Sequence, residues 1–350
     1  MAQSGPSATQ NQPPAPPAPR PSPSTRPSAG KHQISRIIAL MNQKGGVGKT
    51  TTAVNLAAAI AERGRTTLLV DLDPQAHATM HLGVDPGERP LTVYDLLLNP
   101  GGPGQSAADT VDPLDALVCV RPNLGLIPAS TDLAAAESEL ASEPDRQLRL
   151  TRALEPLRSI YEFIIIDCPP SLGLLTLNAL AVAREVIVPM QPQFLALQGL
   201  GKLLETVTLV GRSVNPRLRV SGVTLCMHEE TTRHAREVVA DIESFFAAAT
   251  DADCPWRGAQ VYRPPVRRNI KLAECPSFGQ TIFEYAPGCP GALDYAGLGE
   301  TIVAEWDQML ARRQNQTSPG PSGQESPIRP EDAPKVVVRG SVPAVGEMKH

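Results

Sequence analysis

The chain has 350 residues, of which 41% are hydrophobic and 19% are charged, and its formal net charge is −4. This length is sufficient for one large α/β core, and the slightly acidic balance argues against a protein that binds nucleic acid over its whole surface. Six cysteines without a C-x-x-C pair, and no apolar run of membrane-spanning length, lead us to expect reduced thiols in a cytoplasmic protein.

The two ends of the chain differ in composition from its middle. Residues 1–30 contain nine prolines and no acidic residue, and the chain is again rich in Pro, Ser and Gly from about residue 313. Such segments bury too little apolar surface to offset the entropy lost on ordering. We therefore expect a disordered tail at 1–33, a single folded domain at 34–312 and a second disordered tail at 313–350.

Between these ends, apolar segments alternate with segments of helical character, which is typical of a doubly wound, mostly parallel sheet flanked by helices. Residues 68–70 and 164–166 are continuously apolar, which indicates strands that are buried on both faces. The predicted strands are 36–41, 67–71, 125–128, 163–167, 185–189, 220–227 and 259–263. The predicted helices are 50–63, 93–98, 148–159, 172–183, 197–213, 233–248 and 291–312.

The first predicted strand and helix are joined by the loop Lys44-Gly45-Gly46-Val47-Gly48-Lys49-Thr50-Thr51. Strand, glycine-rich turn and helix is the context that a phosphate-binding loop requires, because backbone N–H groups and the helix dipole attract a polyphosphate. We expect Lys49 on the β- and γ-phosphates of ATP and the Thr50 hydroxyl on Mg²⁺. The loop departs from the usual motif, since Gln43 stands where glycine is expected and Lys44 adds a second lysine that is free to reach elsewhere.

Carboxylates follow two of the buried strands. Asp71 and Asp73 come after residues 68–70, and Asp167 comes after residues 164–166. The carboxyl ends of parallel strands meet at one edge of the sheet, where the phosphate-binding loop also lies. An apolar strand that ends in aspartate is the arrangement that binds Mg²⁺, so we assign Asp167 to the metal. For Asp73, the alternative is a structural role in which it only caps the following turn.

The loop at 44–51 resembles the deviant Walker A motif of the ParA/MinD ATPases, a group of P-loop NTPases. The similarity extends over residues 34–310 and is closest to the chromosomal ParA/Soj branch. It includes Asp71-Leu72-Asp73-Pro74-Gln75, Asp167-Cys168-Pro169-Pro170 and Arg267-Arg268-Asn269-Ile270-Lys271. Because relatives share the Asp-Cys-Pro-Pro segment, we interpret Cys168 as a packed thiol and not as a nucleophile.

The resemblance assigns roles to individual residues. It implies that Lys44 crosses a dimer interface to the partner's nucleotide, and that Asp73 orients or activates the attacking water. Asp71 then supports the Mg²⁺ shell, and Asn269 hydrogen-bonds adenine. Relatives commonly have proline at the position of Arg267, so the shape of the base pocket is less well defined than the phosphate site.

A basic segment lies near the end of the predicted domain. Residues 255–273 contain five basic residues and no acidic one. The resemblance places DNA contacts at Lys271, with Arg267 and Arg268 beside it and Arg233 as the nearest match to a further arginine of the family. Such a surface would bind phosphates without reading bases, with a strong dependence on salt.

The resemblance therefore implies an ATPase with slow intrinsic turnover that forms an ATP-sandwich homodimer. The dimer would bind DNA non-specifically and release it on hydrolysis, stimulated by a partner similar to ParB. The protein would be cytoplasmic, associated with the nucleoid when ATP is bound, and would not bind membranes. The cargo, whether chromosome, plasmid or protein array, stays open.

Three other functions fit parts of the sequence. A MinD-like or protein-cargo positioning ATPase would share the loop without acting on DNA, although residues 313–350 are too rich in Pro and Gly for a membrane-binding amphipathic helix. A nitrogenase iron-protein type would need two suitably placed cysteines per chain. An ATP-dependent biosynthetic synthetase would need a motif for a second substrate.

Overall fold

The computed structural model describes residues 34–101, 110–193, 196–229 and 233–317. The chain divides into two units, residues 1–306 and 307–350. The described residues of the second unit, 307–317, are the end of helix α12 (Pro290–Thr317), so this helix extends into the segment that composition assigned to the C-terminal tail. The predicted N-terminal tail lies outside the described residues.

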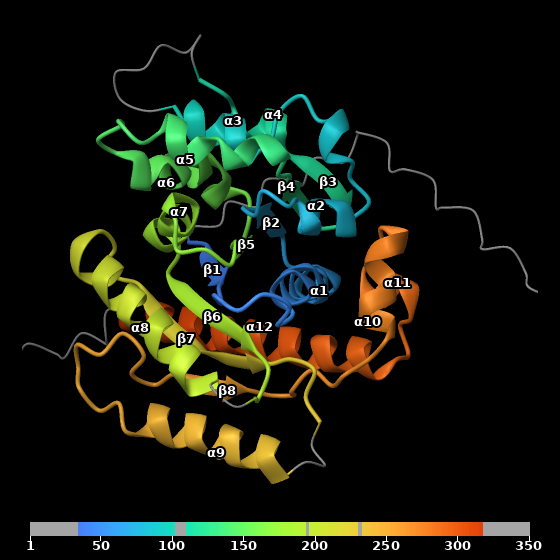
Figure 1. Cartoon of the computed structure of the whole chain (residues 1–350), viewed down its shortest axis with the longest axis vertical. Helices are drawn as coiled ribbons and strands as arrows, with labels where there is room; N and C mark the ends of the chain where they lie inside the picture. Colours follow the sequence, from blue (N-terminus) through green and yellow to red (C-terminus); the bar gives the residue numbers. More distant parts are fainter. Residues whose placement is uncertain (1–33, 102–109, 194–195, 230–232, 318–350) are drawn as a thin grey trace, which may run out of the picture. The chain divides into compact units, whose positions relative to one another are not determined.

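An eight-stranded sheet forms the centre of the first unit (Figure 1). Its strands are β1 (Arg36–Leu40), β2 (Thr67–Asp71), β3 (Val118–Arg121), β4 (Leu124–Ile127), β5 (Phe163–Asp167), β6 (Glu185–Met190), β7 (Arg219–Leu225) and β8 (Gln260–Tyr262). They are arranged in the order β3-β4-β2-β5-β1-β6-β7-β8, and every pairing is parallel except that of β3 with β4. The predicted doubly wound, mostly parallel α/β fold is confirmed.

The helices that precede α12 range from one turn to five. They are α1 (Lys49–Glu62), α2 (His77–His81), α3 (Val93–Leu98), α4 (Pro113–Ala116), α5 (Ala136–Glu139), α6 (Arg149–Leu154), α7 (Leu174–Val182), α8 (Ala196–Ser213), α9 (Arg233–Ala247), α10 (Lys271–Glu274) and α11 (Ile282–Tyr285). The longer helices lie where the sequence predicts them. The short helices α2, α4, α5, α10 and α11 were not predicted, because one turn is too short to show a 3.6-residue period.

Alternate side chains of a strand point to opposite faces of the sheet, and each face has its own helices. Ile37 and Ala39 belong to a core that includes side chains of α3, α6, α7 and α8. On the other face, α1 packs on β1, β2 and β5, and Phe163 lies against Trp306 of α12 with ring centroids 5.9 Å apart. Burial on both faces explains why these strands are continuously apolar.

Strand β3 is absent from the sequence-based prediction. It is four residues long, pairs antiparallel with β4 and contains a register shift between Cys119 and Arg121. The turn that joins the two strands contains Asn123 in the left-handed region, with φ of 59°. A short edge strand with an irregular register does not show the continuous apolar pattern by which the central strands are recognised.

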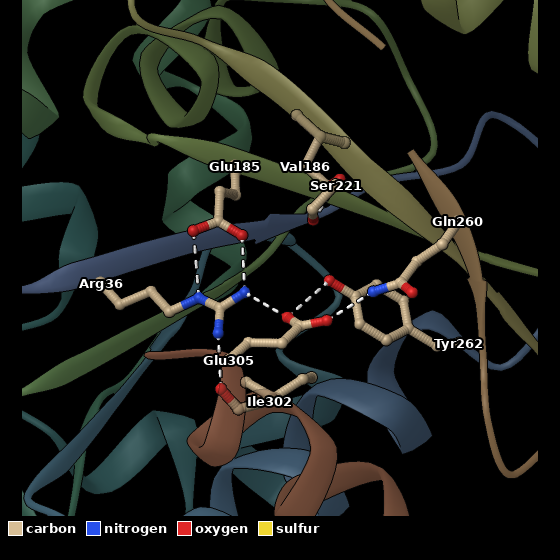
Figure 2. A network of polar contacts seen from close by, with 8 residues as sticks. All are labelled: Arg36, Glu185, Val186, Ser221, Gln260, Tyr262, Ile302 and Glu305. Atoms are coloured by element: carbon tan, nitrogen blue, oxygen red, sulfur yellow. Dashed lines mark hydrogen bonds and ion pairs between the residues drawn. The ribbon is translucent and has the colours of Figure 1, made fainter. Parts of the chain in front are cut away.

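The amino end of β1 is held by a buried arginine (Figure 2). Arg36 is 4% exposed. Its guanidinium donates to both carboxylate oxygens of Glu185 at 3.0 and 2.7 Å, to Glu305 of α12 at 3.0 Å, and to the Ile302 carbonyl at 2.6 Å. Tyr262 of β8 donates to the same Glu305 carboxylate at 3.2 Å. These bonds join β1, β6 and β8 to α12, and Arg36 lies at the end of β1 opposite the phosphate-binding loop.

Candidate functional site

The glycine-rich loop connects β1 to α1 and requires glycine at two positions. Gly46 and Gly48 have φ values of 69° and 95°, which side chains rarely tolerate. A methyl group at Gly48 would also lie only 3.3 Å from Cβ of Cys226, which follows β7. The loop therefore exposes backbone at the head of α1, as phosphate binding requires.

Lys49 and Thr50 begin α1, and hydrogen bonds to residues near the C-terminal end of the domain hold the first turns of this helix in place. Lys49 is 8% exposed, which is unusual for a lysine. The Thr52 hydroxyl lies 3.0 Å from the Tyr295 hydroxyl of α12. Asn55, which is fully buried, accepts a hydrogen bond from the Ile282 backbone N–H at 2.8 Å. The helix end that carries the predicted phosphate and Mg²⁺ groups is thus fixed in position.

Asp167 lies beside this helix end, with its carboxylate buried. Asp167 and Asp71 are register partners on the adjacent strands β5 and β2. Within the described residues, neither carboxylate oxygen of Asp167 has a hydrogen-bond partner. Burial raises the pKa of Asp167 well above its ordinary value and Asp71 adds to the increase, while the nearby Thr50 hydroxyl and Lys49 ammonium oppose it.

This arrangement fits a divalent cation. Two buried carboxylate oxygens without partners, next to a hydroxyl, are oxygen donors of the kind that Mg²⁺ prefers. A cation there would also stabilise the ionised form of Asp167, which burial alone disfavours. Asp167 and Thr50 are therefore the residues of this chain that would hold Mg²⁺.

Asp71 is more fully occupied than Asp167. One of its oxygens accepts from the Thr79 backbone N–H at 2.8 Å and the Thr79 hydroxyl at 2.7 Å, and the other accepts from the Asp73 N–H at 3.2 Å. Burial raises its pKa to about 6, although these hydrogen bonds lower it. Asp71 thus ties β2 to α2, and its predicted place in the Mg²⁺ shell stays a prediction.

Asp73 is 8% exposed and lies just beyond the end of β2. One of its oxygens accepts from the Gln75 N–H at 2.9 Å, which is the turn-capping interaction that we considered as the alternative. The cap uses one carboxylate oxygen and fixes the orientation of the other. Capping and activation of a water are therefore compatible, and the catalytic role of Asp73 stays a prediction.

Lys44 lies on the exposed side of the loop, unlike Lys49. Its ammonium donates to the Gln193 side-chain oxygen at 2.7 Å, and its backbone N–H donates to Asn42 at 2.9 Å. Gln191 donates to the Gly46 carbonyl at 3.2 Å. Sequence reasoning missed both glutamines. The signal in the sequence was only two amides directly after β6, the strand next to β1.

Asn269, the predicted adenine contact, precedes α10. Its side-chain oxygen accepts from the Lys271 backbone N–H at 2.9 Å, which forms a tight turn at the entry to this helix. The segment that follows reaches α2, where Cys275 Sγ lies 3.6 Å from His81 Nε2. Gly83 and Gly279 are also packed so closely that a methyl group at Gly279 would lie 2.8 Å from Cα of Gly83. The predicted base-binding segment is thereby joined to the helix that follows Asp73.

The basic segment is not a surface of isolated cations. Arg267 donates to Asp294 through its backbone and guanidinium, with a shortest distance of 2.6 Å. Each of the other predicted DNA-contacting residues is paired with a carboxylate that lies outside residues 255–273 or at its margin. These pairs are Arg268 with Glu229 at 3.0 Å, Lys271 with Glu274 at 2.8 Å and Arg233 with Glu237 at 2.8 Å.

All six cysteines are free thiols, and Cys168 is fully buried. Burial raises the pKa of Cys168 above its ordinary range, so the unreactive thiol form predominates. Across the described residues, no cluster of three or more His, Cys, Asp or Glu side chains is arranged to hold a metal ion. No helix in the same residues is long and apolar enough to span a membrane.

The fold and the site define a P-loop nucleotide-hydrolysing protein. A family model described as an AAA domain matches residues 35–220, more than half of the chain. The chromosome partitioning protein ParA of Myxococcus xanthus is 42% identical over 270 residues, covering 77% of this chain and 88% of that protein. Soj, the sporulation initiation inhibitor of Bacillus subtilis, is 42% identical over 271 residues, covering 77% and 99%. The chain belongs to the ParA/Soj family of chromosome-partitioning ATPases, which confirms the family predicted from the sequence.

Solved structures share the fold of this chain. Cobyrinic acid a,c-diamide synthase from Mycobacterium smegmatis, determined with ADP and magnesium, has a TM-score of 0.64 and 36% identity, covering 79% of this chain and 97% of that protein. The cell division ATPase MinD of Pyrococcus furiosus, at 24% identity and a TM-score of 0.56, shares the fold. The predicted ATPase activity, with ATP and Mg²⁺ as cofactors, is confirmed.

Proposed function

We propose that ATP closes two copies of this chain face to face, and that hydrolysis separates them. The observation that carries this proposal is the contrast between the two lysines of one loop. Lys49 is buried at the head of α1, where the chain's own nucleotide would lie, whereas Lys44 is exposed and held by a single exchangeable contact. Lys44 is thus available to a nucleotide on a second copy, and the closed dimer lasts as long as the γ-phosphate.

Hydrolysis in this proposal depends on residues that the fold already orients. Lys49 binds the β- and γ-phosphate oxygens, and Asp73 directs a water at the γ-phosphate with the oxygen that does not cap the turn. Mg²⁺, held by Asp167 and Thr50, would neutralise negative charge on these phosphates. Asp71 supports the site by fixing α2 through Thr79.

DNA binding follows from joining two basic surfaces. In one copy, Lys271, Arg267 and Arg268 are each paired with a carboxylate, so a DNA phosphate must replace that carboxylate or share the cation with it. Binding by one copy is therefore weak. Dimerisation places two such surfaces on one duplex, which raises the affinity through bivalency without a new contact.

The cycle is completed by an activating protein similar to ParB, which would accelerate a slow intrinsic turnover. Hydrolysis then dissolves the dimer and releases DNA. In a cell, this cycle corresponds to a cytoplasmic protein that associates with the nucleoid in its ATP-bound state. Repeated attachment and release would move or position DNA cargo.

The second candidate is a positioning ATPase that does not act on DNA. The observation in its favour is the neutralisation of Arg233, Arg267, Arg268 and Lys271 by carboxylates, which weakens the case for a nucleic-acid surface. A third candidate, a synthetase like the Mycobacterium smegmatis protein, is distinguished by its need for a second substrate. Phosphate release from ATP without any small-molecule acceptor would contradict that third function.

The first experiment is binding to a random-sequence DNA duplex with ATP, with ADP and without nucleotide, over a series of salt concentrations. We expect tight binding only with ATP, and a steep loss of affinity as salt rises. Lys44→Ala is the matched control, because it should bind ATP and fail to bind DNA. If no nucleotide state binds DNA while ATP still drives dimerisation, the second candidate replaces this proposal.

A further inference from the structure

Three hydrogen bonds connect residues 42–46, at the start of the phosphate-binding loop, to the end of β6 and the residues after it. Asn42 donates to the Pro189 carbonyl at 2.8 Å, and Gln191 donates to the Gly46 carbonyl at 3.2 Å. Lys44 donates to Gln193 at 2.7 Å. Strand β1 lies between β5 and β6, so the loop has the Asp167 carboxylate on one side and these amides on the other.

The position of Gln193 is set by its backbone. Its N–H donates to the Gln191 carbonyl at 2.9 Å, and its own carbonyl accepts from the Ala196 N–H at 3.0 Å. Pro192, between the two glutamines, is buried. This tight turn presents the Gln193 carboxamide to the Lys44 ammonium, while both side chains stay exposed to solvent.

We propose that Gln193 is a positioning residue that holds Lys44 within its own subunit and so sets the threshold for dimerisation. The inference rests on the proposed function, in which Lys44 must reach the nucleotide of a second copy. A lysine that donates to Gln193 is withdrawn from that role, because closing the dimer requires the ammonium to leave the amide. The intramolecular contact and the intermolecular one therefore compete for the same side chain.

The chemistry of an amide suits this competition. A neutral oxygen accepts from an ammonium without forming an ion pair, so the contact is weaker than the one a carboxylate would make at the same place. A nucleotide phosphate carries full negative charge and would take the lysine from an amide more readily than from a carboxylate. The strength of the group at position 193 should therefore shift the monomer–dimer equilibrium in a predictable direction.

The test uses the full chain with a non-hydrolysable ATP analogue and Mg²⁺, and measures the protein concentration at half-dimerisation by sedimentation. Gln193→Ala should lower that concentration about 3- to 10-fold, and Gln193→Glu should raise it by a similar factor. The affinity of the monomer for the analogue, measured at low protein concentration, should be the same in all three proteins. Gln198→Ala and Gln198→Glu, at an exposed glutamine of α8, are the matched controls and should have no effect.

Equal half-dimerisation concentrations across the Gln193 series, or the opposite order, would overturn the inference. A change in the analogue affinity of the monomer that accounts for the shift would also overturn it, because Gln193 would then act on the loop as a whole. Lys44→Ala separates failure of the proposed function from failure of the inference. If this variant dimerises like the parent, the proposed function fails, whereas loss of dimerisation together with a flat Gln193 series removes only the inference.

Discussion

The phosphate-binding site and the basic segment at 255–273 both concentrate charge, but they hold it in different environments. Lys49 and Asp167 are buried, and the Asp167 oxygens have no hydrogen-bond partner among the described residues. Arg268 is exposed and Lys271 is partly exposed, and each already pairs with a carboxylate. A buried carboxylate without hydrogen-bond partners is costly to ionise until a cation arrives, whereas an ion pair at the surface contributes little and exchanges readily. The phosphate-binding site is therefore prepared for a ligand, whereas in the proposed function the basic segment binds phosphate only by exchanging it for a carboxylate.

The largest effect should come from a substitution in the phosphate-binding site. Asp73→Ala should lower ATP turnover by on the order of 10²- to 10⁴-fold, which is the usual contribution of a positioned acid–base group. ATP binding and dimerisation should persist, because the other phosphate-binding residues are unchanged. Single-turnover phosphate release, together with sedimentation, measures both properties. Normal turnover in this variant would leave Asp73 with its turn-capping role alone.

Lys49→Ala should weaken ATP binding by on the order of 10²-fold, because the variant cannot make the charge-assisted hydrogen bond to the phosphates. The change also leaves Asp167 without its nearby cation, so the remaining affinity should depend more strongly on Mg²⁺. Titration with a fluorescent ATP analogue at several Mg²⁺ concentrations measures this. Lys44→Ala is the control in the same loop and should keep the ATP affinity of the monomer. Equal losses of affinity in the two variants would contradict the proposal that only Lys49 binds the chain's own nucleotide.

The contact between α2 and the 3-10 helix η6 (Cys275–Phe278) joins the two regions and should respond to pH. Burial lowers the pKa of His81 to about 4, below the ordinary value of 6.5. The unfolded chain therefore takes up a proton at a higher pH than the native chain does. The free energy of unfolding should fall by about 1.5 kcal/mol between pH 6.5 and 5 from this group alone.

Urea unfolding at these two pH values measures the His81 effect. His81→Gln should reduce the pH dependence, because the buried group that must stay neutral is removed. His77, which is exposed on the same helix, supplies the control variant His77→Gln, and it should leave the dependence unchanged. Parallel pH profiles for all three proteins would show that His81 does not control this contact.

The smallest effect should come from a substitution in the basic segment at 255–273. Lys271→Glu should weaken DNA binding by the ATP-bound dimer about tenfold at low salt, and it should reduce the salt slope by about one for each cation–phosphate pair that no longer forms. Glu274→Gln is the matched variant, because it releases Lys271 from its carboxylate partner and should strengthen binding. DNA affinity and sedimentation measured on the same samples separate a weaker DNA surface from a weaker dimer. If both variants bind DNA as the parent does, the DNA surface lies elsewhere.

The sequence predicted the loop and the strands of the phosphate-binding site because each of these parts is short and contiguous, while the roles of the residues in them stay predictions. Lys44–Thr51 adopts the loop expected of it, and the central strands place Asp71 and Asp167 in register. The sequence did not predict the ion pairs of the basic segment, because the carboxylates of Glu229 and Asp294 come from distant positions in the chain. Contacts of this kind depend on the tertiary fold, which no local pattern encodes.

Other features that the sequence did not predict also lack a local pattern. Gln191 and Gln193 act through a neighbouring strand, so their contacts with the loop follow from the strand order β5-β1-β6 and not from any motif. Strand β3 is an irregular edge strand without a continuous apolar run, and the one-turn helices are too short for a periodic signal. Long central strands and helices, by contrast, are specified by continuous burial and by the 3.6-residue period.

The two outer strands of the sheet have a consequence for how copies of this chain can contact one another. One end is β3, a four-residue antiparallel strand with a register shift, and the other is β8, which is three residues long and is packed against α9. Short and irregular outer strands are poor templates for another chain to extend. Copies of this chain that are crowded together should therefore not aggregate through strand addition. Contacts between them can then stay reversible, as the proposed nucleotide-dependent dimer requires.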